Sequence, residues 1–196
     1  MATLTTGAHA TTTTIGFEGQ TSYAAVANTY LSQGVTFDSG ILFANVCDYT
    51  LPDCYYNSAV YPPHSGTGAA LTDGANPEPL TISFTAPVSN VSLWFSSPGD
   101  FTLSAYDASG NLLGSDTEPP AYETTAEAAV NFSGISYVTY SNDFNNGAGQ
   151  GGAGFDVIDD LSFSTASPVP EPSSFALLGT GLLGAVGVIR RRILTR

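Results

Sequence analysis

Asp159 is the residue whose position in the sequence makes the strongest chemical demand. It lies in an apolar run, and the alternation of a strand puts it on the same side as Val157, Leu161 and Phe163. A carboxylate on the buried side of a sheet is costly unless a cation accompanies it, and no lysine or arginine precedes Arg190. We therefore expect a bound cation at Asp159.

Calcium suits this position better than magnesium or zinc, because it accepts oxygen ligands from separate segments in a flexible geometry. Glu18, which follows the first expected strand, and Asp159 are the favoured ligands, and Asp38 and Asp73 are candidates for the remaining positions. The alternative is that Asp159 lies at the margin of the sheet, reaches solvent or caps a turn, and binds no metal. The sequence thus predicts a structural calcium site.

Three aromatic side chains are candidates for stacking on sugar rings. Trp94, Tyr106 and Tyr140 alternate with apolar residues such as Leu93 and Ile135, so strand parity puts them on the outer face of a sheet. Aromatic residues exposed on a β-surface often mark binding. The alternative is that a loop covers them or that they form cross-strand pairs.

The sequence offers no comparable set of residues for catalysis. His9 precedes the expected domain and His64 lies in a proline-rich loop, so a Ser-His-Asp triad cannot be assembled. The many acidic residues single out no carboxylate pair for glycoside hydrolysis. The sequence therefore predicts no catalytic residues and a protein that is not an enzyme.

Cys47 and Cys54 are the two cysteines of the chain. Two thiols are too few to form a structural zinc site. In an oxidising compartment we expect them to form a local disulfide that closes a loop, and two free buried thiols are the alternative.

The elements that must position these residues are β-strands, because the apolar periodicity is two. Leu80–Phe84 and Val91–Phe95 alternate apolar with polar residues. Further strands are expected at 14–17, 35–43, 101–106, 112–114, 128–132, 135–141 and 155–163. The pattern favours an all-β fold, an antiparallel, jelly-roll-like β-sandwich.

The expected strands place one β-sandwich domain at residues 14–165, after a leader at 1–13. A linker at 166–174 and a short hydrophobic helix with a basic tail at 175–196 follow it. Residues 44–78 form an irregular, tyrosine-rich segment with both cysteines. A loop of this length inside a compact domain is usually functional, so we expect a binding surface there.

The composition favours an extracellular protein. The 196-residue chain has a formal net charge of −13, and all of its 17 acidic residues except Glu171 precede Ser167. Such a chain lacks the cationic groups that nucleic acid requires, so no nucleic-acid partner is expected. Only 11% of its residues are charged, against about 25% in an ordinary soluble domain.

The C-terminal tail has three parts in a fixed order. A proline-bracketed box precedes an uncharged apolar run at 175–189, and a basic cluster follows; the box is Val169, Pro170, Glu171 and Pro172, and the cluster is Arg190, Arg191 and Arg192. The prolines keep the box extended. As a helix the run would measure about 22 Å, short for a hydrocarbon core of about 30 Å. An ordinary membrane anchor with cytoplasmic arginines is one interpretation.

This ordered tail resembles the PEP-CTERM sorting signal of Gram-negative bacteria. The resemblance implies recognition by an exosortase, transient anchoring in the inner membrane through the apolar helix, and cleavage at or near the Pro-Glu-Pro box. It also implies delivery to the cell surface or the extracellular space, often in bacteria that make exopolysaccharide and biofilm. Extracellular polysaccharide is therefore an expected partner.

The N-terminal leader has only some of the features of a signal peptide for export. Ala8-His9-Ala10 resembles a signal-peptidase site, yet the preceding residues have neither a basic region nor an apolar core. We expect that the front of a signal peptide lies upstream of Met1. A threonine-rich leader without a targeting role is the alternative.

Two short motifs also resemble, loosely, calcium-stabilised jelly-roll carbohydrate-binding modules: Phe17-Glu18 near the start of the domain and Asp159-Asp160-Leu161 near its end. Together these observations predict an exported, non-catalytic structural or exopolysaccharide-associated protein. A carbohydrate-binding or adhesion module with a defined glycan ligand is the alternative, and a hydrolase is a more distant third.

Overall fold

The computed structural model describes residues 10–46, 56–72, 79–143 and 155–165. Both cysteines, Asp73, residues 1–9 and the whole tail with its expected helix lie outside the described residues. Residues 11–13, which the sequence assigned to the leader, belong to the first strand of the domain. The chain divides into two units, Thr11–Ala166 and a second unit formed by Met1–Ala10 with Ser167–Arg196. All the strands given below belong to the first unit.

Within the described residues, the chain forms antiparallel strands and one short 3-10 helix. The elements are β1 (Thr11–Ile15), η1 (Leu31–Gln33), β2 (Val35–Phe37), β3 (Ile41–Asn45), β4 (Gly68–Thr72), β5 (Leu80–Ser97), β6 (Asp100–Tyr106), β7 (Leu112–Glu118), β8 (Ala121–Asp143) and β9 (Val157–Thr165).

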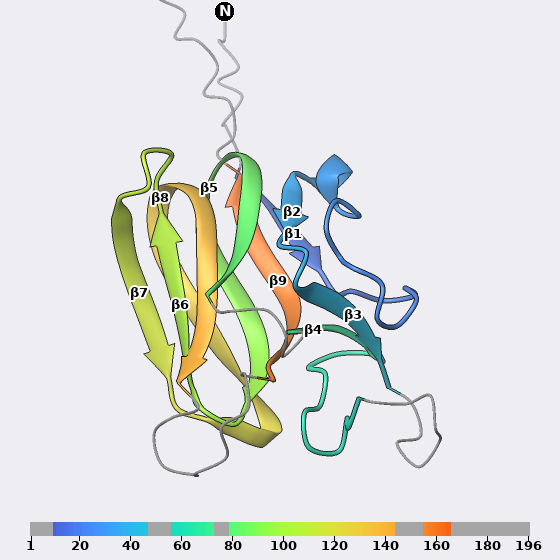
Figure 1. The fold of residues 1–196 in the computed structure, drawn as a ribbon. Helices are drawn as coiled ribbons and strands as arrows, with labels where there is room; N and C mark the ends of the chain where they lie inside the picture. Colours follow the sequence, from blue (N-terminus) through green and yellow to red (C-terminus); the bar gives the residue numbers. More distant parts are fainter. Residues whose placement is uncertain (1–9, 47–55, 73–78, 144–154, 166–196) are drawn as a thin grey trace, which may run out of the picture. The chain divides into compact units, whose positions relative to one another are not determined.

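The strands build a β-sandwich of jelly-roll-like form in which the two longest strands, β5 and β8, belong to both layers (Figure 1). In the first layer the order is β2-β5-β8-β6-β7. In the second layer, β8 and β5 are followed by β9, which pairs on its other side with β1 and with β4, and β4 pairs with β3. The predicted antiparallel sandwich is confirmed.

Irregularities in the strand ladder let β5 and β8 pass from one layer to the other. Their pairing shifts register between Ser83 and Val88 and on both sides of Ser89. Close by, Asn90 on β5 and Gly134 on β8 have φ angles of 50° and 81°. Bulges of this kind bend a strand and allow it to turn the corner of a sandwich.

These bends change the strand boundaries that the sequence predicts. The expected strands 80–84 and 91–95 are the two halves of β5, and 128–132 and 135–141 both lie in β8. The expected strand 35–43 is instead two strands, because a turn separates β2 from β3. β4 lies within the segment that was expected to be irregular.

The core lies between the two layers and is rich in aromatic rings. Phe95, Phe101 and Tyr140 form a stacked series, with ring centroids 4.2 Å and 5.6 Å apart. On the other side of the core, Phe17 makes edge-to-face contacts with Tyr30 and other aromatic rings. These rings anchor the strands whose opposite sides form the outer surface.

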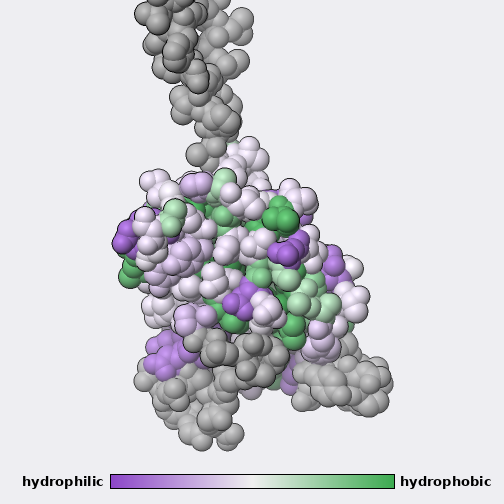
Figure 2. Space-filling model, turned by 45° about the horizontal axis from the view of Figure 1, so that its top comes forward, coloured by the Kyte–Doolittle hydropathy of each residue, from purple (hydrophilic) through white to green (hydrophobic). Residues whose placement is uncertain are grey.

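The outer surface is polar without being highly charged. In Figure 2 most of the visible face of the domain has the pale colours of intermediate hydropathy, and strongly hydrophilic or hydrophobic residues form only scattered spots. This appearance agrees with a chain in which 11% of the residues are charged.

Candidate functional site

Tyr106 and Tyr137 form a stacked pair on the outer side of the first layer. They are direct cross-strand partners on β6 and β8, with ring centroids 4.8 Å apart and planes inclined by 5°. Both residues are half-buried, whereas Ala105 and Val138 beside them are fully buried in the core. The pair therefore presents flat aromatic surface outward.

Hydroxyl side chains continue this surface in rows that cross the strands. The tyrosine row continues with Ser83 and Thr36; the next row is Ser115, Ser104, Thr139 and Thr81, and the last is Thr117, Thr102 and Ser141. Neighbouring hydroxyls are bonded, with 2.8 Å between Ser104 and Ser115 and 3.0 Å between Thr102 and Thr117. We call these two tyrosines and nine hydroxyl residues the Tyr106 face; none of them is charged.

Tyr140, which the sequence assigned to the same outer surface, is in the core instead. It is 0% exposed, its ring stacks on Phe101, and its hydroxyl lies 3.3 Å from Thr72 Oγ1. The prediction was wrong because it extended the parity of Ile135 along an unbroken strand, and the irregular pairing of β5 with β8 reverses that parity before Val138. For the same reason sequence parity missed Tyr137.

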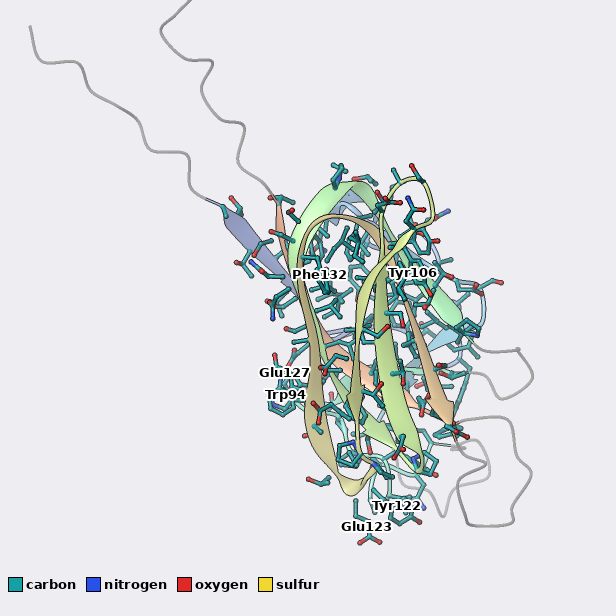
Figure 3. The ribbon with its side chains drawn as sticks, turned by 90° about the vertical axis from the view of Figure 1, so that its left-hand side faces the viewer. Trp94, Tyr106, Tyr122, Glu123, Glu127 and Phe132 are labelled. Atoms are coloured by element: carbon teal, nitrogen blue, oxygen red, sulfur yellow. The ribbon has the colours of Figure 1, made fainter. Side chains whose placement is uncertain are left out.

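Trp94 lies on the outer side of the second layer, beside its cross-strand partner Glu127 on β8 (Figure 3). The ring of His64 stacks on the indole, with centroids 3.6 Å apart and planes inclined by 10°. His64 Nδ1 lies 2.7 Å from Asp160 Oδ2, which fixes the edge of the imidazole. Trp94 is thus half-buried on the predicted outer face, but the loop before β4 partly covers it, as the alternative interpretation had it.

The same loop is tied to the domain by two of the predicted metal ligands. Asp159 Oδ2 accepts a hydrogen bond of 2.8 Å from the Ser65 amide, and Glu18 Oε1 accepts bonds of 3.1 Å and 3.0 Å from the Thr67 and Gly68 amides. Glu18 and Asp159 therefore meet at one short stretch of backbone. Amide N–H groups supply the positive ends of dipoles that the buried carboxylate requires.

The other two predicted ligands do not join them. Asp38 lies in the turn between β2 and β3, where its Oδ1 accepts a 3.0 Å hydrogen bond from the Gly40 amide, and Asp73 lies outside the described residues. Over the described ranges no group of three or more His, Cys, Asp or Glu side chains is placed to hold a metal ion. Calcium binding stays a prediction from the sequence.

Asp159 is buried, with 2% of its surface exposed, but it does not share a face with Leu161 and Phe163 as the sequence predicts. It is the cross-strand partner of Trp94 and lies on the outer side of β9, under the loop before β4. The alternation is interrupted at Asp160, whose φ angle is 45°.

Burial raises the pKa of the Asp159 carboxyl from 3.8 to about 6, although the amides of Ser65 and Asp160 act in the opposite direction. Loss of water around the charged carboxylate raises this pKa by more than the hydrogen bonds from the backbone amides lower it.

This pKa has a consequence for stability. A carboxyl whose pKa is higher in the folded than in the unfolded state contributes stability below about pH 4 that is lost as the pH rises through about 6. We expect the free energy of unfolding to increase when the pH is lowered from about 7 to about 5, and Asp159→Asn should flatten that dependence. Urea unfolding at a series of pH values measures it.

Asp107→Asn is the matched control. Hydrogen bonds from Asn111 lower the pKa of this exposed turn carboxyl, so it stays ionised over the same range and its replacement should leave the slope unchanged. If Asp159→Asn keeps the wild-type slope, Asp159 does not titrate as its burial implies.

The rest of the expected binding segment also packs onto the domain. Tyr61 contacts the rings of Phe155 and Tyr122, with centroids 5.0 Å and 5.8 Å away, and its carbonyl accepts a 2.6 Å hydrogen bond from the Tyr56 hydroxyl. The predicted disulfide lies outside the described residues. His64 had no signal in the sequence, because only the fold brings it to Trp94.

The predicted sorting residues also lie outside the described residues. Among the residues that the structure places, no helix has the length and apolar character required to cross a membrane. The description of the tail therefore rests on its amino-acid sequence.

The comparison with protein families finds one match. Residues 168–192 match the PEP-CTERM protein-sorting motif, a range that includes the proline-bracketed box and the three adjacent arginines. The resemblance stated above is confirmed. The motif marks the chain for exosortase processing and for export and sorting to the cell envelope of a Gram-negative bacterium.

Curated proteins show no match to the chain. Similar solved structures include a TmCBM61 protein in complex with β-1,4-galactotriose, at a TM-score of 0.37 and 13% identity, covering 76% of this chain and 100% of that one. A xylan-binding domain from CBM 22 has a TM-score of 0.40 and 12% identity, with 81% and 95% covered. An arabinose-bound MgGH51 α-L-arabinofuranosidase has a TM-score of 0.42 and 15% identity, with 76% and 25% covered. These likenesses assign no ligand to this chain.

Proposed function

We propose that this exported protein acts at the cell surface or in the extracellular matrix as a non-catalytic, exopolysaccharide-associated protein. The sorting motif brings the chain to the envelope. The Tyr106 face then holds polysaccharide chains there without changing them.

One observation carries the proposal, namely the uncharged Tyr106 face on a chain with a net charge of −13. The flat pair of Tyr106 and Tyr137 can stack on the apolar side of a sugar ring. The adjoining rows of serine and threonine hydroxyls can donate hydrogen bonds to sugar hydroxyls and accept them. Such a surface suits a polymer that carries no charge, because neither partner must lose the hydration of an ion.

Three acidic residues near the loop before β4, Glu18, Asp159 and Asp160, already have structural partners, which supports a non-catalytic role for them. Asp160 bonds to His64 and Ser65, with distances of 2.7 Å and 3.0 Å, and Asp159 and Glu18 accept backbone amides. Their hydrogen bonds hold the loop before β4 in place.

Replacing the two tyrosines tests the proposal. Tyr106→Ala and Tyr137→Ala should each weaken binding of the polysaccharide by about tenfold, because each removes one ring of the stack. Affinity electrophoresis of the full chain in mild detergent measures it, with hydroxyethylcellulose, galactomannan and exopolysaccharide purified from the producing bacterium in the gel.

Tyr122→Ala is the control, since this exposed aromatic residue lies outside the Tyr106 face. It should leave the retardation unchanged. Wild-type protein that none of the three polymers retards, or tyrosine variants that fold and are retarded like the wild type, would refute the proposal. Retardation by one polymer of the three favours an adhesion module with a defined glycan ligand.

A further inference from the structure

The outer face of the second layer also combines a flat aromatic pair with rows of hydroxyl side chains, although acidic residues, Glu127 and Asp159, are the cross-strand partners of Trp94. Beside Trp94 on β5 lies Ser92, and across the neighbouring strands Ser92 is followed by Ser162 and Thr14. The hydroxyl oxygens of Ser162 and Thr14 are 2.6 Å apart. A second row consists of Ser89, Ser164 and Thr12. We call the seven residues of these rows, including Trp94, together with His64, the Trp94 face.

The aromatic end of this face is also a flat, stacked pair. The rings of His64 and Trp94 are parallel within 10°, and the side chain of His64 is 32% exposed. Asp160 fixes the imidazole from its edge, so the ring face remains the broad surface that the pair offers. Glu127 beside Trp94 disfavours an anionic polymer at this position.

The two faces point in opposite directions. Leu93 precedes Trp94, Ala105 precedes Tyr106, and both are fully buried in the same core between the layers. Since consecutive residues of a strand point to opposite sides, Trp94 and Tyr106 must both point away from that core. Figure 3 shows them on different sides of the domain. The sheets of a sandwich pack about 10 Å apart, so a stiff chain lying flat on one face cannot also lie on the other.

We propose that the protein binds two uncharged polysaccharide chains at once, one on the Tyr106 face and one on the Trp94 face, and thereby cross-links them. This inference rests on the proposed function, because it assigns the same class of ligand to a second site. A two-faced binder joins separate chains when its sites cannot engage the same stretch of polymer.

Variants that change one face at a time test the proposal. On the Trp94 face, Trp94→Ala removes the platform, and Ser92→Gln lays a longer side chain across the hydroxyl row while keeping the indole. On the Tyr106 face, Tyr106→Ala is combined with Tyr137→Ala. The full chain in mild detergent is mixed with hydroxyethylcellulose, with galactomannan and with the purified exopolysaccharide, and both affinity electrophoresis and low-shear viscosity are measured.

Wild-type protein should raise the viscosity of a polymer that retards it. Variants of either face should still be retarded, about tenfold more weakly at most, but should lose the rise in viscosity. The combined variant of both faces should lose retardation as well. Two variants of the Trp94 face guard against loss of folding, because Ser92→Gln leaves the aromatic stack in place.

Two results would overturn the proposal while leaving the proposed function intact. In the first, the Tyr106 and Tyr137 double variant is no longer retarded by any polysaccharide. The Trp94 face would then not be a polysaccharide-binding site. In the second, folded Trp94→Ala or Ser92→Gln protein still raises viscosity, so that cross-linking comes from association of the chains. If wild-type protein is not retarded at all, the proposed function fails together with the inference.

Discussion

Gly68→Ala should destabilise the domain by about 3 kcal/mol, although it adds a single methyl group. Its Cβ would lie 2.6 Å from the carbonyl oxygen of Phe17 and 2.9 Å from the Cα of Glu18. Both are backbone atoms, so no change of rotamer relieves the overlap. The residues after β1 must move away from the start of β4, and the hydrogen bond from the Gly68 amide to Glu18 Oε1 is disturbed with them.

Gly114→Ala is the matched control, since Gly114 is also a strand glycine whose added Cβ would overlap a neighbour. That neighbour is the ring of Phe132, which is 37% exposed and can swing toward solvent. We expect a loss below about 1 kcal/mol. Urea unfolding of the two variants compares them, and equal effects would show that the contact at Gly68 yields as easily as an exposed side chain.

Replacing Pro170, Glu171 and Pro172 together by alanine should abolish processing of the tail. In the sequence the box lies between the domain and the apolar run, and alanine removes both the restricted backbone of the prolines and the carboxylate. The chain should then accumulate in the membrane fraction at its unprocessed mass. Mass spectrometry of membrane and extracellular fractions from the producing bacterium measures this outcome.

The chain contains its own control for this experiment. Pro77, Glu78 and Pro79 form a second Pro-Glu-Pro sequence, but strand β5 follows it instead of an apolar run with arginines. Glu78→Ala should therefore leave processing unchanged, whereas Glu171→Ala alone should reduce it. Normal processing of the triple-alanine chain would mean that the box is not what the sorting enzyme recognises.

The sequence predicted the sandwich because most strands have one face in the core and one outside. β6 and the first part of β5 alternate buried and half-buried residues without interruption, and their periodicity was visible. The sequence did not predict β4, because this strand lacks such an alternation. Its residues Gly68 to Thr72 are all buried, because β3 and β9 flank it and side chains cover both of its faces. A short run of glycine, alanine and leucine buried on both sides has no alternation to detect.

The sequence predicted the residues of the candidate site only in stretches where inward-facing and outward-facing side chains alternate without interruption. Trp94 and Tyr106 follow regular stretches, and their outward positions were found from the sequence. Tyr140 and Tyr137 lie beyond the corner at which β8 changes layers. Extending the parity of Ile135 past this corner therefore put Tyr140 on the outer face, where Tyr137 lies, although Tyr140 is in the core. The partnership of His64 with Trp94 depends on a loop that crosses to another strand, and no local pattern encodes it.

The position of β9 has a mechanical consequence for a protein whose tail continues from its last strand. β9 is hydrogen-bonded along one side to β5 and along the other to β1 and β4, with Thr165 paired to both Val88 and Thr11 (Figure 1). A tensile load applied to the chain beyond Thr165 and directed along the strand would therefore shear many hydrogen bonds simultaneously, on two ladders, instead of opening them one after another. The tail therefore continues from a strand that is hydrogen-bonded to neighbouring strands on both of its sides.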